Sequence, residues 1–311
     1  MRIIPWKTDC DLTLLPQLNN KYLSLKGGLE IIHEKQTRFG GFSALWADSA
    51  GKRLITVSDF TSVRKAFPDS LRALWYEFKP VFDAEGNLTN LQQNKSGQMQ
   101  KPDGRAIPEI ESCAVHKDMM FITRDNGEAH RILRIPLNRF NNAGPVQTDT
   151  EEIPVKTFPE KAKQGFEAAA TTADGRLLLI REESTEKQFA KTWLIKPGDS
   201  SAREKYFRLT QGAAKGMTKL GNNNFLIIEK SFKKGHTKMA ITLLPKHELQ
   251  NDTLKTKVLL SAESNCLDNF EGIAAFVRDN KEYFFLITDN NGDWQKAGKQ
   301  KNLLLLFEIR R

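Results

Sequence analysis

One short motif recurs five times along the chain, and this repetition constrains the fold more than any other feature. Each copy has a polar third residue and is followed by a tight turn and an apolar run. The copies lie at 41–45, 109–113, 165–169, 216–220 and 269–273, and their third residues are Ser43, Glu111, Glu167, Thr218 and Glu271. Those third residues are separated by 68, 56, 51 and 53 positions. A fixed period of roughly 20–50 residues indicates repeated structural units packed side by side.

Each repeat has the strand content of a propeller blade. Turns such as Asp174-Gly175 supply the positive φ angles that tight hairpins need. The apolar runs that follow are too short for helices and predict second strands at 53–57, 119–123, 177–180, 225–228 and 283–288. Third strands are expected at 73–78, 131–135, 192–195, 239–243 and 303–309, and outer strands at 88–91, 151–155, 205–209 and 257–260. Four antiparallel strands per repeat predict an all-β fold, a single β-propeller.

The last repeat lacks a fourth strand, because the sequence ends at Arg311 soon after the third. An N-terminal strand at 28–33, or at 22–25, is free to fill that place. Such closure pairs both chain ends within one sheet and removes open edges. We therefore predict five blades in one domain, 21–311, after an N-terminal extension, 1–20. Six blades are the alternative, if the long first interval contributes another sheet.

Charge and hydropathy narrow the partners. The net charge of +9 favours an anionic partner, and we expect a small anionic substrate or ligand. The lysines lie in loop stretches without interleaved aromatic residues, which argues against nucleic acid. No apolar run approaches the length of a membrane span. A monomer is expected.

Two series of polar side chains should meet at one mouth of the central channel. Strand direction alternates within a blade, so the start of the first strand and the end of the second lie at the same end. The first series is the motif's third residue, and the second is Asp59, Asp125, Glu182, Glu229 and Asp289. Such carboxylates repel one another unless a bound cation, raised pKa values or interleaved Arg and Lys offset them. A divalent cation, with calcium as the first candidate, would suit them. The alternative is a structural role, in which each acid accepts hydrogen bonds from the next blade.

Several of these segments carry a resemblance to a known family. They are 39–45 with 57–59, Ile110-Glu111-Ser112 followed by His130-Arg131, Gly216-Met217-Thr218 with Ile228-Glu229-Lys230, and 268–273, 288–291 and 300–305. In this order they resemble the phytase-like esterase family of bacterial propellers, described as "esterase-like activity of phytase". The resemblance implies a propeller, ester hydrolysis, and a periplasmic or secreted location. The N-terminus lacks the apolar segment of a signal peptide, so a cytoplasmic location is the alternative.

Together these features predict a metal-assisted hydrolase of phosphate or other anionic esters, acting at the channel mouth. Glu111, Glu167 and Glu271 are the predicted catalytic residues and metal ligands. Further predicted metal ligands are Asp59, Glu229 and Asp289. Predicted substrate-binding residues are Ser43, Arg124, His130, Arg131, Thr218 and Lys301. A propeller that binds a ligand or a protein without turnover is the alternative, and a metal-dependent lactonase is a weaker one.

Overall fold

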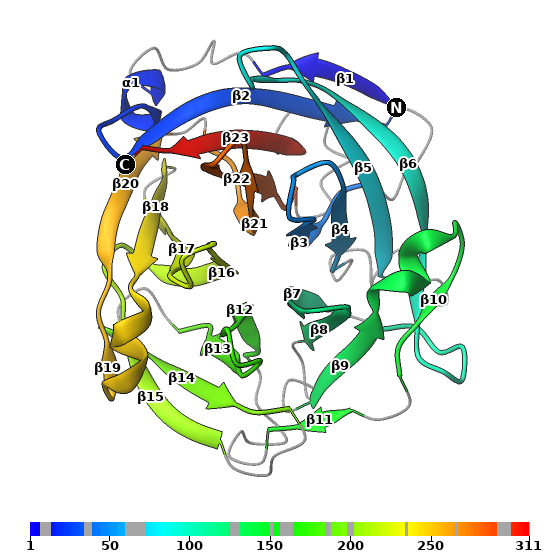
Figure 1. Ribbon diagram of the computed structural model, residues 1–311, viewed down its shortest axis with the longest axis vertical. Helices are drawn as coiled ribbons and strands as arrows, with labels where there is room; N and C mark the ends of the chain where they lie inside the picture. The colour runs from blue at the N-terminus through cyan, green and yellow to red at the C-terminus, as the bar shows by residue number, and fades with distance from the viewer. Residues whose placement is uncertain are drawn as a thin grey trace.

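The computed structural model arranges five sheets in a ring around a central channel (Figure 1). It describes residues 1–6, 14–33, 39–59, 73–107, 109–124, 131–149, 152–155, 164–183, 188–197, 202–233, 236–264, 267–290 and 300–310. The predicted five-bladed β-propeller is confirmed. Within the described ranges, no helix is both long and apolar enough to cross a membrane.

The first three blades follow one another along the chain. Blade one consists of β3 (Phe42–Ala47), β4 (Leu54–Ser58), β5 (Leu74–Phe82) and β6 (Leu88–Gln100), with β10 (Val146–Gln147) pairing in parallel outside β6. Blade two consists of β7 (Ile110–His116), β8 (Met119–Arg124), β9 (Arg131–Pro136) and β11 (Ile153–Pro154), and the short helix η2 (Leu137–Asn141) follows β9. Blade three consists of β12 (Phe166–Thr171), β13 (Leu177–Arg181), β14 (Phe189–Ile195) and β15 (Ala202–Arg208), with β19 (Thr253–Leu254) outside β15.

The last two blades complete the ring. Blade four consists of β16 (Ala213–Lys219), β17 (Phe225–Lys233), β18 (His236–Leu244) and β20 (Lys257–Ser264), and the short helix η3 (Lys246–Gln250) follows β18. Blade five consists of β21 (Phe270–Arg278), β22 (Lys281–Thr288), β23 (Leu303–Ile309), β2 (Leu23–Ile32) and β1 (Arg2–Pro5). Helix α1 (Leu14–Leu18) lies between β1 and β2 in the chain and contacts β20.

The N-terminal strand closes the ring, as the sequence predicted. Strand β2 pairs with β23 through contacts such as Leu29↔Leu304, and β1 pairs with the outer side of β2. Both ends of the chain therefore lie in the sheet of blade five (Figure 1). The long first interval contains the extended hairpin of β5 and β6, which have 9 and 13 residues, and the described residues form no sixth sheet.

The core is divided among the interfaces between blades. Five apolar clusters each join two adjacent blades, and the second strands supply residues to both sides. Leu178 and Leu179 are consecutive on β13, yet Leu178 packs toward blade four and Leu179 toward blade two. Because neighbouring strand residues face opposite sides, a strand buried on both faces reads as a continuous apolar run. These runs hold the first strands close around the channel.

Candidate active site

Every blade carries a β-bulge at the same place in its first strand. The register shifts fall between Phe42 and Ala44, Ile110 and Ser112, Phe166 and Ala168, Ala214 and Gly216, and Phe270 and Gly272. The bulged residues are therefore Ser43, Glu111, Glu167, Lys215 and Glu271. A bulge leaves one residue out of the ladder and re-aims its side chain. In blade four this residue is Lys215, three positions before the Thr218 that the sequence motif indicated.

The second series also changes in blade four. The residue before each bulge pairs with the end of the second strand: Phe42↔Ser58, Ile110↔Arg124, Phe166↔Arg181, Ala214↔Glu229 and Phe270↔Thr288. The next residues along the chain are therefore equivalent, and those described are Asp59, Glu182, Lys230 and Asp289. Lys230, and not Glu229, matches the acids of the other blades. Blade four thus places lysines at both mouth positions.

The two lysines bind acids of the neighbouring blades. Lys215 Nζ lies 3.2 Å from Glu167 Oε2 and 2.5 Å from Glu182 Oε1, both in blade three. Lys230 Nζ lies 3.0 Å from Glu271 Oε1 in blade five. The lysine side chains are 13% and 15% exposed, so these charge-assisted hydrogen bonds are largely screened from water. The resulting cluster spans blades three, four and five.

Burial and charge separate the pKa values of the three predicted catalytic acids. Burial raises the pKa of Glu167 to about 8, although Lys215 opposes the rise. Burial, together with the charges of Glu167, Asp59 and Glu271, raises the pKa of Glu111 well above its usual value. Burial would also raise the pKa of Glu271, but Lys230 and Lys215 together hold it below the usual value. At neutral pH, Glu167 therefore holds a proton while Glu271 is ionised, which is the division that an acid and a base require.

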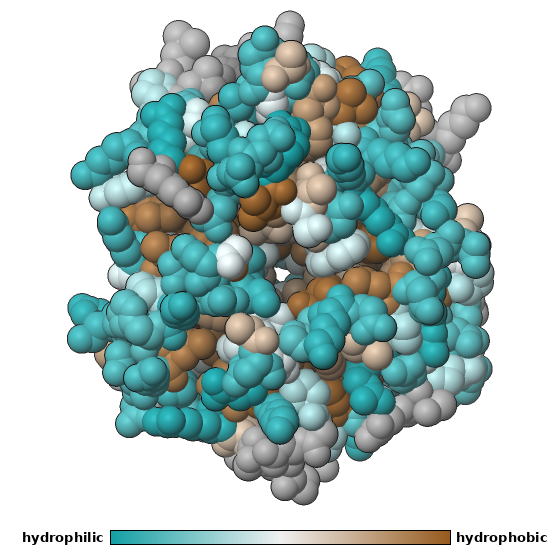
Figure 2. Space-filling view, viewed as in Figure 1, coloured by the Kyte–Doolittle hydropathy of each residue, from teal (hydrophilic) through white to brown (hydrophobic). Residues whose placement is uncertain are grey.

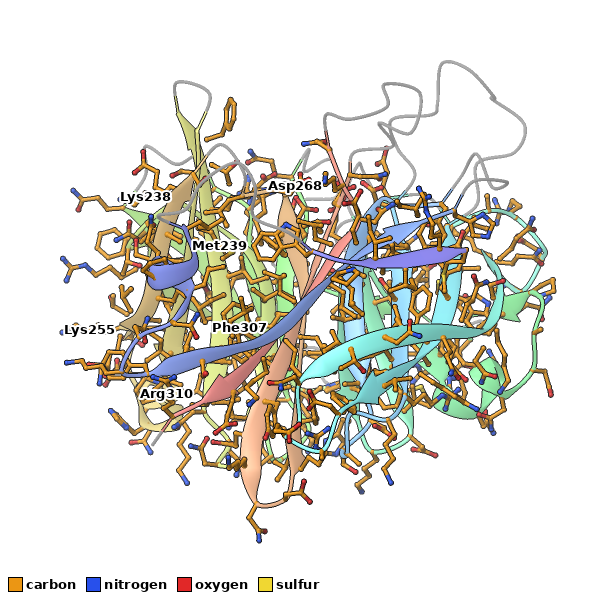
Figure 3. All side chains as sticks on the ribbon, turned by 90° about the horizontal axis from the view of Figure 1, so that it is seen from above. Lys238, Met239, Lys255, Asp268, Phe307 and Arg310 are labelled. Carbon is orange, nitrogen blue, oxygen red and sulfur yellow. The ribbon has the colours of Figure 1, made fainter. Side chains whose placement is uncertain are left out.

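The cluster lies at the end of the ring where the first strands begin. In Figure 3, Asp268 marks that end, two residues before β21, and Arg310 lies toward the opposite side. Beyond the bulges, the first strands line a cavity of about 120 Å³ whose walls include Leu45, Cys113 and Thr218. Figure 2 shows a small opening at the centre of the ring. Pockets for small molecules usually hold ≈ 300 Å³ or more, so a substrate would sit at the mouth rather than in the channel.

Ser43 and Thr218 connect neighbouring blades. The Ser43 hydroxyl donates a hydrogen bond to the backbone carbonyl of Ile110 in blade two. The Thr218 hydroxyl, inside the channel, accepts one from the backbone N–H of Ala275 in blade five, at 3.1 Å. Both are hydrogen bonds to the backbone that hold first strands together.

Asp59 and Asp289 follow the second strands of blades one and five. The charge of Asp59 is one of the causes of the raised pKa of Glu111, which places Asp59 near the mouth acids. Asp289 is buried and accepts a hydrogen bond from Asn269 Nδ2 at 3.2 Å. Asn269 precedes β21 and Glu271.

Glu229 faces away from the mouth cluster. Its carboxylate accepts hydrogen bonds from the backbone N–H groups of Thr210 and Gln211, at 2.6 and 2.8 Å, and from Thr242 Oγ1, at 3.1 Å. The side chain is fully buried. Glu229 therefore holds the turn that leads into β16, the strand on which Lys215 lies.

The predicted basic residues lie in two further places. Arg124 and Arg131 both pair with Glu152, at 3.4 and 3.5 Å, beside blade two. Lys301 Nζ pairs with Glu30 Oε2 of the closing strand β2, at 2.8 Å. His130, like Asp125, lies outside the described residues. The mouth thus gathers Glu111, Glu167 and Glu271 with Asp59 nearby, and the predicted substrate-binding residues are spread over several parts of the ring.

Sequence reasoning missed Lys215, although a signal was present. Each bulged residue is followed by a small one, namely Ala44, Ser112, Ala168, Gly216 and Gly272. The first strands of neighbouring blades lie too close together for a large residue at this position. A Cβ on Gly216, for example, would lie 2.1 Å from the backbone oxygen of Glu271. Thr218 is followed by Lys219, which breaks the pattern, whereas Lys215 fits it.

With this geometry in view, comparison with known proteins identifies the family. The model of the family "Phytase-like", described as "Esterase-like activity of phytase", matches residues 37–292. The chain belongs to the phytase-like family. The match covers parts of all five blades and confirms the resemblance that the sequence motifs indicated. No curated protein matches the chain.

Solved structures resemble this phytase-like protein in fold only. The tail fiber of Staphylococcus aureus phage P68 is 10% identical, with a TM-score of 0.50, and covers 93% of this chain and 52% of its own. A glycoside hydrolase family 43 arabinoxylan arabinofuranohydrolase from Bacillus subtilis is 10% identical, with a TM-score of 0.49. The match covers 88% of this chain and 64% of the hydrolase. Kuenenia stuttgartiensis hydrazine synthase is 10% identical, with a TM-score of 0.42. The match covers 82% of this chain and 57% of the synthase. The chain thus spans less than two thirds of each of these proteins.

The mouth of this phytase-like protein does not suit the predicted divalent cation. Calcium takes six to eight oxygen ligands. Across the described ranges, no three His, Cys, Asp or Glu side chains lie together as metal ligands do. Lys215 and Lys230 already place positive charge on the acids that a cation would need. The cation stays a prediction from sequence.

Proposed function

We propose that this protein hydrolyses ester bonds at the channel mouth and that its substrate is a phosphate ester or another anionic ester. The family description supports the reaction class. The observation that carries the proposal is Glu167, a buried carboxyl with a pKa of about 8, in contact with Lys215 and beside the ionised Glu271. Perturbed carboxyls at a cleft are typical of general acid–base sites.

Each side chain has one step in the reaction. A water molecule attacks the phosphorus or carbonyl carbon of the ester, and the Glu271 carboxylate takes its proton. The bond to the leaving oxygen breaks, and Glu167 gives that oxygen its proton. The proton on Glu271 then returns to Glu167 through solvent, so one water is consumed and the site is restored. Lys215 stabilises the negative charge that develops on the substrate oxygens.

Hydrolysis by the full-length chain tests this proposal. p-Nitrophenyl phosphate, bis(p-nitrophenyl) phosphate, p-nitrophenyl acetate and γ-butyrolactone are assayed with wild type, Glu167→Gln and Glu271→Gln, each with EDTA and with calcium. We expect hydrolysis of at least one ester, with kcat/KM lowered about 100-fold or more in both variants, the scale typical of losing a general acid or base.

Glu77→Gln is the matched control. Glu77 is a buried acid on β5 that pairs with Arg53 at 2.5 Å, and its strand position faces Ile55, near the start of β4 and away from the mouth. Its substitution should leave kcat/KM within about threefold of wild type. Wild-type rates in Glu167→Gln would contradict the proposal.

Binding without turnover is the second candidate, and the pairing of the mouth lysines with acids supports it, since such clusters also form ligand sites. A wild-type protein that hydrolyses none of the four substrates, but whose melting temperature rises with inorganic phosphate, would favour this candidate.

A further inference from the structure

Blade four reverses the charge at the channel mouth. At the bulge and at the end of the second strand, the other described blades carry Ser, Glu or Asp, whereas blade four carries Lys215 and Lys230. The equivalent register places both lysines on the ring of side chains around the mouth. The contacts of Lys215 Nζ with Glu167 and of Lys230 Nζ with Glu271 show that both ammonium groups reach that ring.

The two ammonium groups keep donors beyond these ion pairs. A lysine ammonium has three N–H donors. Among the described residues, Lys215 Nζ contacts two acidic side chains and Lys230 Nζ contacts one. An oxyanion at the mouth can therefore accept hydrogen bonds from both lysines without displacing Glu167, Glu182 or Glu271.

The lysines also disfavour a divalent cation. Lys215 Nζ and Lys230 Nζ contact Glu167, Glu182 and Glu271, which are the acids that a cation would need as oxygen ligands.

We propose that Lys215 and Lys230 form an oxyanion site that replaces a divalent metal at the channel mouth, so that a phosphate or carboxylate group binds there without metal. The two ammonium groups contact Glu182 and Glu271 and keep N–H donors for an oxyanion. They are also held by the protein itself, and their affinity does not depend on the metal supply. That the bound anion is part of the substrate rests on the proposed function, whereas anion binding itself does not.

Binding of inorganic phosphate to the EDTA-treated full chain tests the site by thermal shift and calorimetry at constant ionic strength. We expect phosphate to raise the melting temperature and calcium to leave it unchanged. Lys215→Met and Lys230→Met should each weaken phosphate binding about tenfold or more, and Lys215→Arg should retain most of it. Lys205→Met is the control, because Lys205 is a buried lysine on β15 of blade three that donates to the backbone carbonyl of Asn251. Its phosphate affinity should equal that of wild type.

A second variant tests the replacement directly. Lys215→Glu places a carboxylate at the mouth bulge of four blades, together with Glu111, Glu167 and Glu271. We expect this variant to lose phosphate binding and to gain a calcium-dependent rise in melting temperature that wild type lacks.

Two results would overturn the inference: a requirement for calcium in wild-type phosphate binding, or wild-type phosphate affinity in both methionine variants. If Lys215→Met does not fold, Lys230→Met and Lys215→Arg still decide the question. Metal-free phosphate binding without ester hydrolysis would uphold the oxyanion site and refute the proposed function. Ester hydrolysis without phosphate binding would uphold the proposed function and refute the oxyanion site.

Discussion

Glu229 and Lys230 are consecutive on strand β17 and serve opposite sides of its sheet. Glu229 accepts hydrogen bonds from Thr210, Gln211 and Thr242, whereas Lys230 reaches Glu271 across the blade interface. Successive side chains of a strand point to opposite faces. One residue therefore supports the turn before β16, and the next belongs to the mouth cluster.

Replacing Glu229 should cost stability and leave the chemistry intact. Glu229→Ala leaves the N–H groups of Thr210 and Gln211 and the buried hydroxyl of Thr242 without their acceptor. A hydrogen bond to a charged group contributes about 1.5–3 kcal/mol, and water replaces part of this at the exposed turn, so we expect the free energy of unfolding to fall by roughly 2–5 kcal/mol. Urea denaturation measures it, and Glu204→Ala on the exposed outer strand should cost less than about 0.5 kcal/mol. A loss of kcat/KM in the folded Glu229→Ala protein would instead assign Glu229 to the active site.

Glu167 should make the protein less stable as the pH rises. Its pKa is about 8 in the folded protein against a usual value of 4.5, so between these pH values the folded state binds a proton that the unfolded state has released. Stability is then highest below about pH 4.5 for this group and declines toward pH 8. Each pKa unit corresponds to about 1.4 kcal/mol, so a shift from 4.5 to about 8 predicts a decline of roughly 5 kcal/mol.

Glu167→Gln removes this titration, so its unfolding free energy should decline less between pH 5 and pH 8. Chemical denaturation at several pH values measures both curves. Parallel curves for wild type and variant would show that Glu167 titrates normally in the folded protein.

The pH profile of kcat/KM should reflect the two acids. As the general acid, Glu167 loses its proton as the pH passes about 8, so activity should decrease there. Glu271, as the general base, must be ionised. Because Lys230 and Lys215 lower its pKa, the activity of the enzyme should decrease only at a pH below the usual pKa range of a glutamate. The result is a broad bell-shaped profile.

Glu182→Gln gives a sharper form of this test, since the charge of Glu182 contributes to the raised pKa of Glu167. The alkaline limb should move to lower pH in this variant, while the acid limb stays in place. An unchanged alkaline limb would separate Glu167 from that ionisation.

Gly216→Ala should damage the interface between blades four and five. The new methyl group would lie 2.1 Å from the backbone oxygen of Glu271, so one of the two first strands must move. We expect a loss of about 3 kcal/mol or more in the free energy of unfolding. Gly221→Ala is the matched control, because its methyl group meets its nearest atoms at 3.4 Å, an ordinary contact. Equal melting temperatures for the two variants would contradict the geometry.

The repeat predicted the architecture well because strands that are buried on both faces appear in the sequence as continuous apolar runs. Apolar runs such as 177–180 and 283–288 are strands packed on both faces, and the structure places them as β13 and β22. The bulge positions of Ser43, Glu111, Glu167 and Glu271 followed from the same motif. The closing strand followed from the missing fourth strand of the last repeat.

Blade four shows where sequence reasoning stopped. Gly216 imitates the glycines before Ser43 and Glu167, so the motif was aligned three residues too late and selected Thr218. Glu229 was selected in place of Lys230 because an acid was expected, and a shift of one residue exchanges the faces of a strand. The gathering of Arg124 and Arg131 on Glu152 depends on long-range packing that no local pattern encodes.

The shared bulge has a consequence for engineering. The backbone at the mouth follows the same path whether the bulged residue is Ser43, Lys215 or one of the three glutamates. Each blade therefore has one equivalent position at the mouth. A substitution there changes the charge of the mouth, while the strand pairing around it stays the same. If the mouth binds an anion as proposed, substitutions at these positions should change its ligand preference one blade at a time.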